Sequence, residues 1–229
     1  KLTGLAAVVA LTTILVLVLI AVTVGRILHG NSDRRARPTS GKRRLLITGT
    51  FHSIGWMRAH LIPLANSRWV DEVIAIADSP DVELPGVRFT PPPRRLRRLC
   101  GRLPSRTIWL AITALRERPA ALMGYHIMPN ALLCLAIARL VGARAIYQMT
   151  GGPIQVIGGG CGSENTLLRR LPGPSERLER LMLRVVREFD LTVVRGPRAI
   201  DYLSEHGLGD RCEIITAGVD TDRFTPSNE

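Results

Sequence analysis

Residues 45–55 read LLITGTFHSIG, in which a short apolar run passes directly into a turn that contains two glycines. A run of this length is typical of a buried strand, and residues 57–65 then follow with helical spacing. Glycines at such a junction let backbone N–H groups approach a phosphate at the start of the helix. The segment therefore predicts the strand, turn and helix that open an α/β domain, either with a phosphate site or as a tight turn without a ligand.

The same alternation of apolar runs and helical patterns continues along the chain. Strands are expected at residues 45–48, 73–77, 87–89, 121–123, 145–149, 191–194 and 213–215. Helices are expected at residues 57–65, 108–116, 131–140, 176–187 and 198–205. Continuous apolar strands separated by helices indicate a parallel sheet that is covered on both faces. The predicted fold class is α/β, with a single Rossmann-like, doubly wound parallel sheet at residues 45–216.

Sheets of this class bind ligands beyond the carboxyl ends of their strands, near the point where the strand order reverses. The segments that follow the first, fourth, fifth and sixth strands are therefore the places to look for a site. They are residues 49–55, 124–130, 150–162 and 195–197.

The N-terminal segment has a different character, because residues 2–24 include no charged side chain. At about 1.5 Å rise per residue, a helix of this length covers the roughly 30 Å hydrocarbon core of a bilayer. A cleaved signal peptide is the alternative, although its apolar region is usually only about 7–15 residues long. Residues 1–25 are therefore expected to form one transmembrane helix that precedes the α/β domain.

Basic residues follow this apolar segment, and only Lys1 precedes it. They are Arg26, Arg34, Arg35, Arg37, Lys42, Arg43 and Arg44. Because Lys and Arg beside a span stay in the cytoplasm, the domain is expected on the cytoplasmic side of the inner (plasma) membrane. Residues 30–42 are rich in Arg, Ser, Pro and Gly and lack apolar periodicity. Residues 26–44 are interpreted as a basic juxtamembrane tether.

The formal net charge of +12 indicates a negatively charged partner, either a nucleic acid or an anionic membrane. Six arginines alternate with leucines in a second cluster, Arg94, Arg95, Arg97, Arg98, Arg102 and Arg106. A helix there would present arginines to lipid headgroups, or simply a charged face to water. Because no helix-turn-helix, zinc-finger or RNA-recognition signature accompanies the charge, anionic membrane lipids are the expected partner rather than nucleic acid.

Several enzyme and metal-site classes fit the sequence poorly. A short-chain dehydrogenase would need a glycine where Ser53 stands and a Tyr-x-x-x-Lys pair, yet the last lysine is Lys42. A P-loop would need Gly-Lys-Ser/Thr. The four cysteines are dispersed without a Cys-x-x-Cys pair, so reduced thiols are expected rather than zinc or a disulfide framework.

Four segments resemble, in order and spacing, the N-terminal domain of retaining GT-B glycosyltransferases of the family 4 type. Residues 118–126, RPAALMGYH, are similar to a Lys/Arg-Pro-Asp-hydrophobic-hydrophobic-His-x-His segment of that family. Residues 145–151 and 189–195 match its next strands. Residues 214–226, IITAGVDTDRFTP, resemble the Asn-Gly-Val-Asp-x-x-x-Phe-x-Pro hinge. The family pattern is broken at Ala120 and Ala217, and only one of its paired histidines is present.

The resemblance implies roles for individual residues. His126 would face the transferred sugar as the catalytic residue, although a lone histidine is more often structural. Gly55, Thr150, Gly151 and Glu164 would bind substrate. No cofactor is expected to stay bound, because the nucleotide-sugar donor is itself a substrate.

The glycine-rich run at residues 151–165 is long for a compact domain. Its apolar residues Ile154, Val156 and Ile157 would contact a lipid-linked acceptor. A floppy insertion is the alternative.

The family resemblance thus implies the acceptor-binding half of a membrane-anchored glycosyltransferase. Residues 217–229 would form the hinge toward a C-terminal donor domain, and the chain alone would be inactive. The whole enzyme would move a sugar from a nucleotide-sugar to a lipid-linked or envelope glycan acceptor. A noncatalytic membrane-surface binding module and another nucleotide-binding Rossmann enzyme are the alternatives.

Overall fold

The computed structural model describes residues 2–30, 43–51, 53–77 and 82–216. The expected hinge at 217–229 lies outside the described residues, as do 31–42 of the expected tether.

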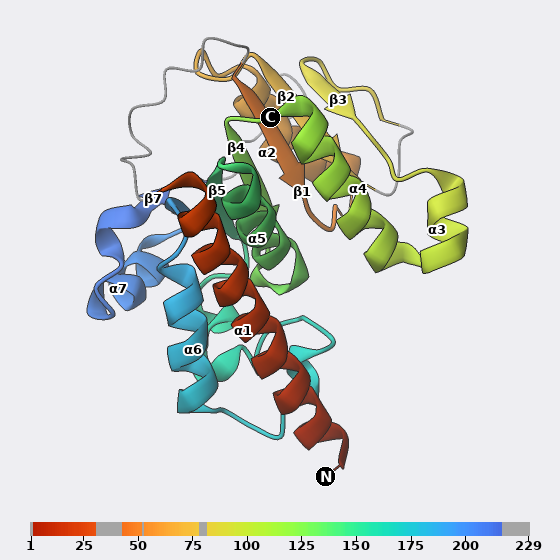
Figure 1. The fold of residues 1–229 in the computed structure, drawn as a ribbon. Coiled ribbons are helices and arrows are strands. Elements are labelled where there is room, and N and C mark those ends of the chain that lie inside the picture. The colour runs from red at the N-terminus through yellow and green to blue at the C-terminus, as the bar shows by residue number, and fades with distance from the viewer. Residues whose placement is uncertain (1, 31–42, 52, 78–81, 217–229) are drawn as a thin grey trace, which may run out of the picture.

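A single seven-stranded sheet forms the centre of the molecule (Figure 1), and all of its strand pairs are parallel. The order is β3-β2-β1-β4-β5-β6-β7. The strands are β1 (Arg44–Thr48), β2 (Glu72–Ile76), β3 (Val87–Phe89), β4 (Ala121–Tyr125), β5 (Arg144–Met149), β6 (Leu191–Val194) and β7 (Cys212–Ile214). The strand order reverses between β1 and β4, which is the switch point of a Rossmann-like sheet. The predicted fold class is confirmed.

Helices cover both faces of this sheet, and alternate strand residues belong to different cores. Leu46 and Leu122 share a cluster with the inner faces of four helices, whereas Ile47 and Met123 face α2. The helices are α2 (Ile54–Ala65) on one face, and α4 (Arg102–Glu117), α5 (Leu132–Val141), α6 (Glu176–Val186) and α7 (Pro197–Glu205) on the other. This division is what right-handed crossovers produce.

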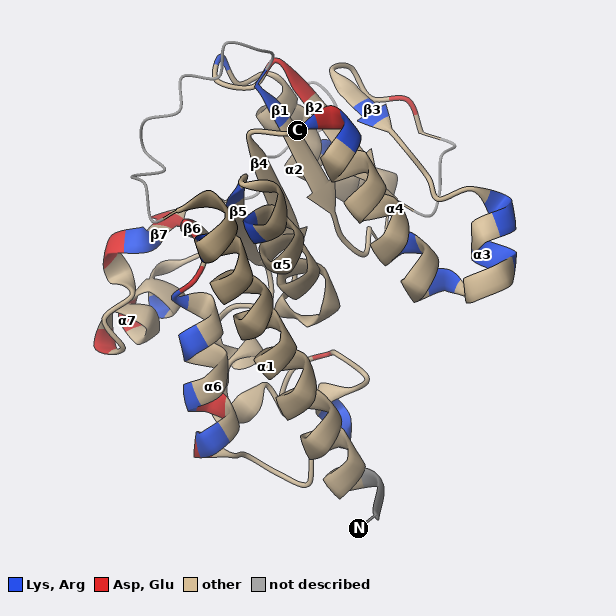
Figure 2. Ribbon diagram, in the orientation of Figure 1, with Lys and Arg blue, Asp and Glu red and all other residues tan. Residues whose placement is uncertain are grey.

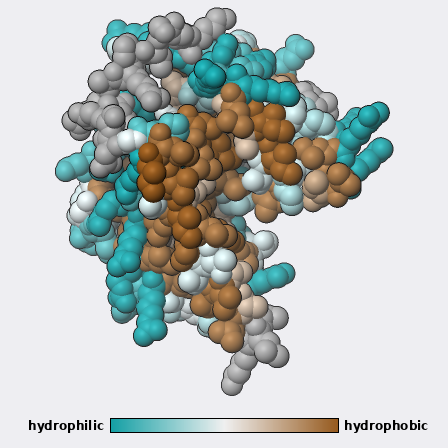
Figure 3. All heavy atoms as spheres, viewed as in Figure 1, coloured by the Kyte–Doolittle hydropathy of each residue, from teal (hydrophilic) through white to brown (hydrophobic). Residues whose placement is uncertain are grey.

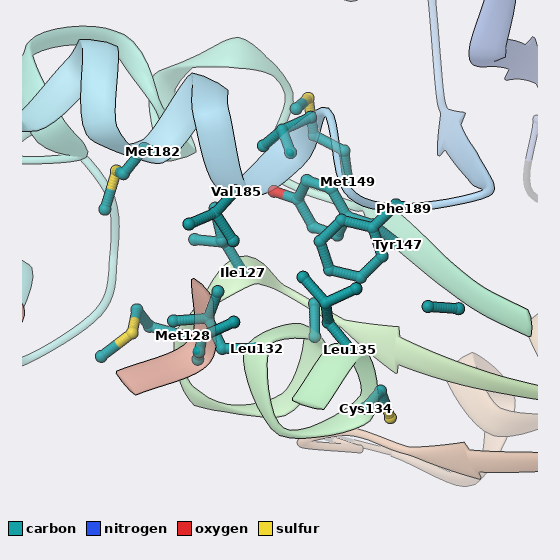
Figure 4. Packing of buried hydrophobic residues seen from close by; sticks show 14 of the residues in the cluster. Ile127, Met128, Leu132, Cys134, Leu135, Tyr147, Met149, Met182, Val185 and Phe189 are labelled. Carbon is teal, nitrogen blue, oxygen red and sulfur yellow. The ribbon is translucent and has the colours of Figure 1, made fainter. Parts of the chain in front are cut away.

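The core under α5 and α6 also includes η2 (Ile127–Ala131), a π-helical turn that follows β4. Figure 4 shows side chains of η2 and α5 facing Tyr147 and Phe189, with α6 closing the cluster from above. Both aromatic rings are buried, and their centroids lie 5.5 Å apart. Burial of large rings makes this part of the fold a rigid support for the loops above it.

The basic segment from residue 94 to 106 forms two helices rather than one. α3 (Arg94–Cys100) ends at Gly101, whose φ of 80° breaks the helix before α4 begins. The interpretation that all six arginines face lipid or water was wrong for Arg106, which is only 8% exposed. Its guanidinium instead donates to the Asn130 side chain at 2.7 Å.

Helix α1 (Leu2–His29) extends past the predicted end at residue 25 and packs lengthwise on the domain (Figure 1). One of its stripes is buried against α5, α6 and a short turn at Leu168–Arg170, while the opposite stripe is exposed. Of the described helices, α1 is the one that is long and apolar enough to cross a membrane. Because one side of the helix is covered by protein, length and apolarity alone do not decide how it meets a bilayer.

Candidate functional site

The carboxyl ends of β1, β4, β5 and β6 meet along one edge of the sheet. The register pairs Thr48 with Gly124, Tyr125 with Gln148, and Met149 with Val194. The four segments singled out from the sequence therefore emerge side by side. This edge contains the strand-order reversal and is where a ligand site is expected.

His126 directly follows β4 in a backbone conformation that is uncommon for a residue with a side chain. Its φ is 61°, and Met128 interrupts the helical geometry of the turn that follows. The sharp return is permitted by Gly124, because a Cβ there would lie 2.3 Å from the Cα of Ala131. Positive φ at a non-glycine residue stores backbone strain, which is concentrated at functional sites.

A polar network of Thr150, Gln155 and Tyr147 holds the His126 ring. The Gln155 Oε1 accepts from the backbone N–H of Ile127 at 3.2 Å and from the Tyr147 hydroxyl at 2.6 Å. The Gln155 Nε2 and the Thr150 Oγ1 each lie 2.9 Å from the His126 Nδ1.

The network determines the tautomer of His126. A backbone N–H can only donate, so the oxygen of the Gln155 amide must face Ile127 and its NH₂ must face the imidazole. The His126 Nδ1 consequently accepts a hydrogen bond, and the proton of the neutral ring sits on Nε2. A half-buried imidazole at the switch point thus presents an N–H donor, with Thr150 Oγ1 at 3.2 Å from Nε2.

Thr150 and Gly151, two of the residues expected to bind substrate, contact this network. Thr150 bonds His126 directly, and a Cβ at Gly151 would lie 2.6 Å from the Gln155 amide nitrogen. Because Gly151 has no side chain, the Gln155 amide can pack against its backbone. Sequence reasoning did not find Gln155, because a single buried glutamine in a glycine-rich run has no distinguishing pattern.

The other two expected substrate-binding residues lie on the surface. Gly55 is in the first turn of α2, and a Cβ there would meet nothing within 4 Å. Glu164 is exposed, whereas its neighbour Asn165 bonds the Met128 carbonyl at 3.0 Å. The structure therefore does not join Gly55 or Glu164 to the His126 network by any described hydrogen bond.

The glycine-rich run is folded onto the domain. Gly159 and Gly160 have φ of 77°, and a Cβ at either position would lie under 3 Å from neighbouring atoms. Val156 is fully buried, which corrects its expected contact with an acceptor, while Ile154 and Ile157 remain exposed. The run is a packed loop, so the interpretation as a floppy insertion was wrong.

Arg106 links the segments that follow β1 and β4 by hydrogen bonds. Its guanidinium donates to the Asn130 side chain and, at 3.4 Å, to the carbonyl of Gly49 after β1. The Asn130 amide in turn donates to the Tyr125 carbonyl at 2.9 Å. This chain of bonds fixes the turn that holds His126 relative to the glycine turn after β1. Arg106 is far in sequence from both Asn130 and Gly49, so no local pattern predicts these bonds.

An aromatic cluster with a charged rim lies beside these loops. Trp56 stacks on His60 with ring centroids 3.9 Å apart, and Tyr125 meets both rings edge-on. His60 Nδ1 donates to the Trp56 carbonyl at 2.9 Å, so Nε2 accepts from Arg195 at 2.5 Å. Burial and then Arg195 lower the pKa of His60, while its bond to the Trp56 carbonyl opposes them.

This shift predicts a pH-dependent stability. The folded state binds the His60 proton less readily than the unfolded chain, whose histidine pKa is 6.5. The stabilisation is therefore complete above about pH 6.5 and is lost as the pH falls toward the folded-state pKa. Urea unfolding of the wild type and of His60→Asn at pH 7.5 and pH 5 should show a steeper loss in the wild type. Equal losses would contradict the shift.

A shallow cleft of about 370 Å³ opens next to Arg195. Its lining residues are Gly152, Pro153, Arg195, Gly196, Pro197, Arg198 and Ala199. The cleft includes the N-terminal end of α7, where Gly196 provides no side-chain cap. Two arginines and a helix N-terminus make this end of the site electropositive, which suits a phosphate group. Within the described ranges, no cluster of His, Cys, Asp or Glu is arranged to hold a metal ion.

No model of a known protein family matches the chain, and no curated protein matches its sequence. Solved structures do match its fold, among them the UDP-N-acetylglucosamine 2-epimerase from Rickettsia bellii, with a TM-score of 0.50 and 12% identity. The match covers 81% of this chain and 48% of the epimerase, so the chain spans about half the length of that neighbour. At this identity, the likeness shows the fold alone: this chain has the fold of one part of a nucleotide-sugar enzyme.

Proposed function

We propose that the chain is the acceptor-side, N-terminal half of a membrane-attached glycosyltransferase of the retaining GT-B type. The enzyme moves a sugar from a nucleotide-sugar to a lipid-linked or envelope glycan acceptor, with the domain on the cytoplasmic side of the inner membrane. The observation that carries the proposal is the His126 ring at the switch point, with the Gln155 Nε2 2.9 Å from its Nδ1 and the Gln155 Oε1 bound to the N–H of Ile127. The order of the sequence motifs and the fold of a nucleotide-sugar enzyme support it.

His126 suits this reaction because sugar hydroxyls need a positioned hydrogen-bond donor of neutral charge. The Nε2–H, which lies 3.2 Å from the Thr150 Oγ1 in the structure, is proposed to donate to a hydroxyl of the transferred sugar in place of Thr150, while Gln155 keeps the ring in place. Thr150 and Gly151 therefore act mainly through His126. Gly55 and Glu164 are exposed and are proposed to contact substrate directly.

The nucleotide diphosphate of the donor is proposed to lie toward the electropositive cleft at Arg195 and the start of α7. Stabilising the departing diphosphate is usually the largest single contribution to such catalysis. Most of those contacts are assigned to a second Rossmann-like domain that follows the segment 217–229, a proposal supported by a neighbour about twice as long. The donor is a substrate, and no permanently bound cofactor is invoked.

The test compares the 229-residue chain with a longer version that extends to the natural stop codon. Both are solubilised in detergent and incubated with a panel of radiolabelled nucleotide-sugars and membrane lipid extract. Label should enter the lipid or glycan fraction only with the longer version, because a GT-B site lies between two domains. Transfer by the 229-residue chain would overturn the division into halves, and transfer by neither would overturn the proposed activity.

A second candidate follows from the neighbour itself, which is named as an epimerase of a nucleotide-sugar. An enzyme of that class alters the sugar without an acceptor. Omitting the lipid extract from the same assay separates the two candidates: glycosyl transfer stops without acceptor, whereas conversion of the nucleotide-sugar itself continues.

A further inference from the structure

Helix α1 is shaped to lie against the domain rather than to leave it. Its buried positions recur at intervals of three and four residues, which is the spacing of a helix packed along other helices. They are Gly4, Ala7, Leu11, Leu15, Val18, Val22 and Gly25. They contact α5 over most of the seam, with α6 and the turn at Leu168–Arg170 completing it.

Glycines stand where the two ends of α1 come closest to the domain. A Cβ at Gly25 would lie 2.3 Å from the Arg139 carbonyl oxygen, and a Cβ at Gly4 would lie 3.4 Å from the Cβ of Pro172. A backbone approach as close as that at Gly25 excludes any side chain. The contact between α1 and the domain therefore requires glycine at a defined position and is not only a general apolar contact.

Polar contacts fix the C-terminal end of the helix. Arg26 pairs with Glu188 at 2.5 Å, and the His29 Nε2 lies 2.9 Å from the carbonyl oxygen of Leu140. Such contacts have defined geometry, so they set the rotation of α1 about its own axis. That rotation turns one particular stripe of the helix outward.

The outward stripe is predominantly apolar over the full length of the helix, about 42 Å, with Thr13 and Thr23 among its exposed residues. Its exposed large residues are Leu5, Val9, Val16, Leu17, Ile20, Val24, Ile27 and Leu28. Figure 3 shows this hydrophobic surface on one face of the molecule, with hydrophilic side chains over α6 and α3 on either side. A contiguous apolar surface of this size marks an interaction site.

The charges of α6 decide how the docked helix can meet a membrane. Arg177, Arg180 and Arg184 are exposed on α6, which lies beside α1 (Figure 2). If α1 stood across the bilayer while docked, it would draw these arginines into the hydrocarbon, at a large cost for each charge. If α1 lay in the plane of the interface, the same arginines would meet the headgroups of anionic lipids.

We propose that α1 does not cross the bilayer but stays docked on α5 and α6 and lies in the membrane plane. Its outward stripe enters the hydrocarbon of one leaflet, and the arginines of α6 and α3 contact anionic headgroups of that leaflet. This arrangement holds the carboxyl edge of the sheet at a fixed orientation to the lipid surface. It does not depend on the reaction that the site performs.

A disulfide between Gly4→Cys and Pro172→Cys tests the arrangement, because the two Cβ positions, 3.4 Å apart, are close to disulfide geometry. The four native cysteines are first replaced by alanine or serine. Membranes that contain the double variant are then oxidised, and the protein is analysed by nonreducing electrophoresis and peptide mapping. The internal disulfide should form in nearly all of the membrane-bound chain. In a spanning helix, residue 4 would lie roughly 30 Å away across the bilayer, and no disulfide would form.

Two controls make the result decisive. Leu5→Cys with Pro172→Cys turns the first thiol outward and should give no disulfide. Leu17→Lys with Ile20→Lys, added to the cross-linking pair, should release the chain from phosphatidylglycerol-containing vesicles while the disulfide still forms. Absence of the disulfide between positions 4 and 172, together with labelling of position 4 from outside intact cells by an impermeant maleimide, would overturn the proposal in favour of a spanning helix.

Discussion

The His126→Asn variant of the longer enzyme should lose about 10²–10³-fold in turnover while its stability stays close to that of the wild type. Asparagine carries a Cβ, as histidine does, so the backbone at residue 126, with φ of 61° and ψ of 145°, is no more strained in the variant than in the wild type. It therefore preserves the turn after β4 but removes the imidazole that Thr150 and Gln155 hold in place. Initial rates at saturating donor, paired with urea unfolding curves, provide both measurements.

A matched His126→Ala variant removes every polar atom of the side chain. Alanine removes the imidazole and leaves the buried Gln155 Nε2 without its partner at residue 126, which costs about 1–3 kcal/mol. It should be as inactive as the asparagine variant and measurably less stable. Full activity in His126→Asn would show that the histidine serves only to shape the turn.

The Gly124→Ala variant should lose about 3 kcal/mol or more of the free energy of unfolding, or fail to fold. The added methyl carbon would lie 2.3 Å from the Cα and 2.6 Å from the N of Ala131. Both are backbone atoms, so neither can swing aside as a flexible side chain does. Relief requires η2 to move away from β4, which strains the bond between Ile127 and Gln155.

Gly55→Ala is the control for this experiment, because a Cβ at Gly55 meets open space and alanine favours the helix. Its urea midpoint should equal or exceed that of the wild type. If Gly124→Ala unfolds at the wild-type midpoint, the close approach of β4 and η2 is not what the fold requires. A loss of substrate affinity in Gly55→Ala without loss of stability would support the proposed contact of Gly55 with substrate.

Secondary structure followed closely from local pattern. The strands at Val87–Phe89 and Leu191–Val194 begin and end where they were predicted. Leu191–Val194 is a largely buried apolar run, which is typical of a parallel strand, whereas Val87–Phe89 lies at the edge of the sheet and leaves Arg88 exposed. The glycine turn after the first strand also indicated the correct edge of the sheet, because ligand-binding loops follow the carboxyl ends of parallel strands. The prediction was less accurate at residue 101, where a single glycine divides the expected helix into α3 and α4.

The site was found only in outline. His126 and Thr150 were singled out through the family resemblance, within segments that follow strands, and parallel topology brings those strand ends together. Gln155, Arg106 and Asn130 were not, because their roles come from partners that are distant in sequence. A buried arginine and a solvated arginine look alike in a sequence of alternating Arg and Leu. Only the tertiary structure shows that Arg106 bonds Asn130 and the Gly49 carbonyl.

The sequence alone determined that this protein has a parallel α/β sheet and an apolar helix at its N-terminus. Both are encoded locally, by the period and length of apolar runs. The tertiary structure decided which side of α1 is covered, because burial depends on partners: the stripe from Gly4 to Gly25 meets α5 and α6, and the opposite stripe meets none of the described protein. It also decided the tautomer of His126, since a proton's position follows from the hydrogen-bond partners that the fold assembles around the ring.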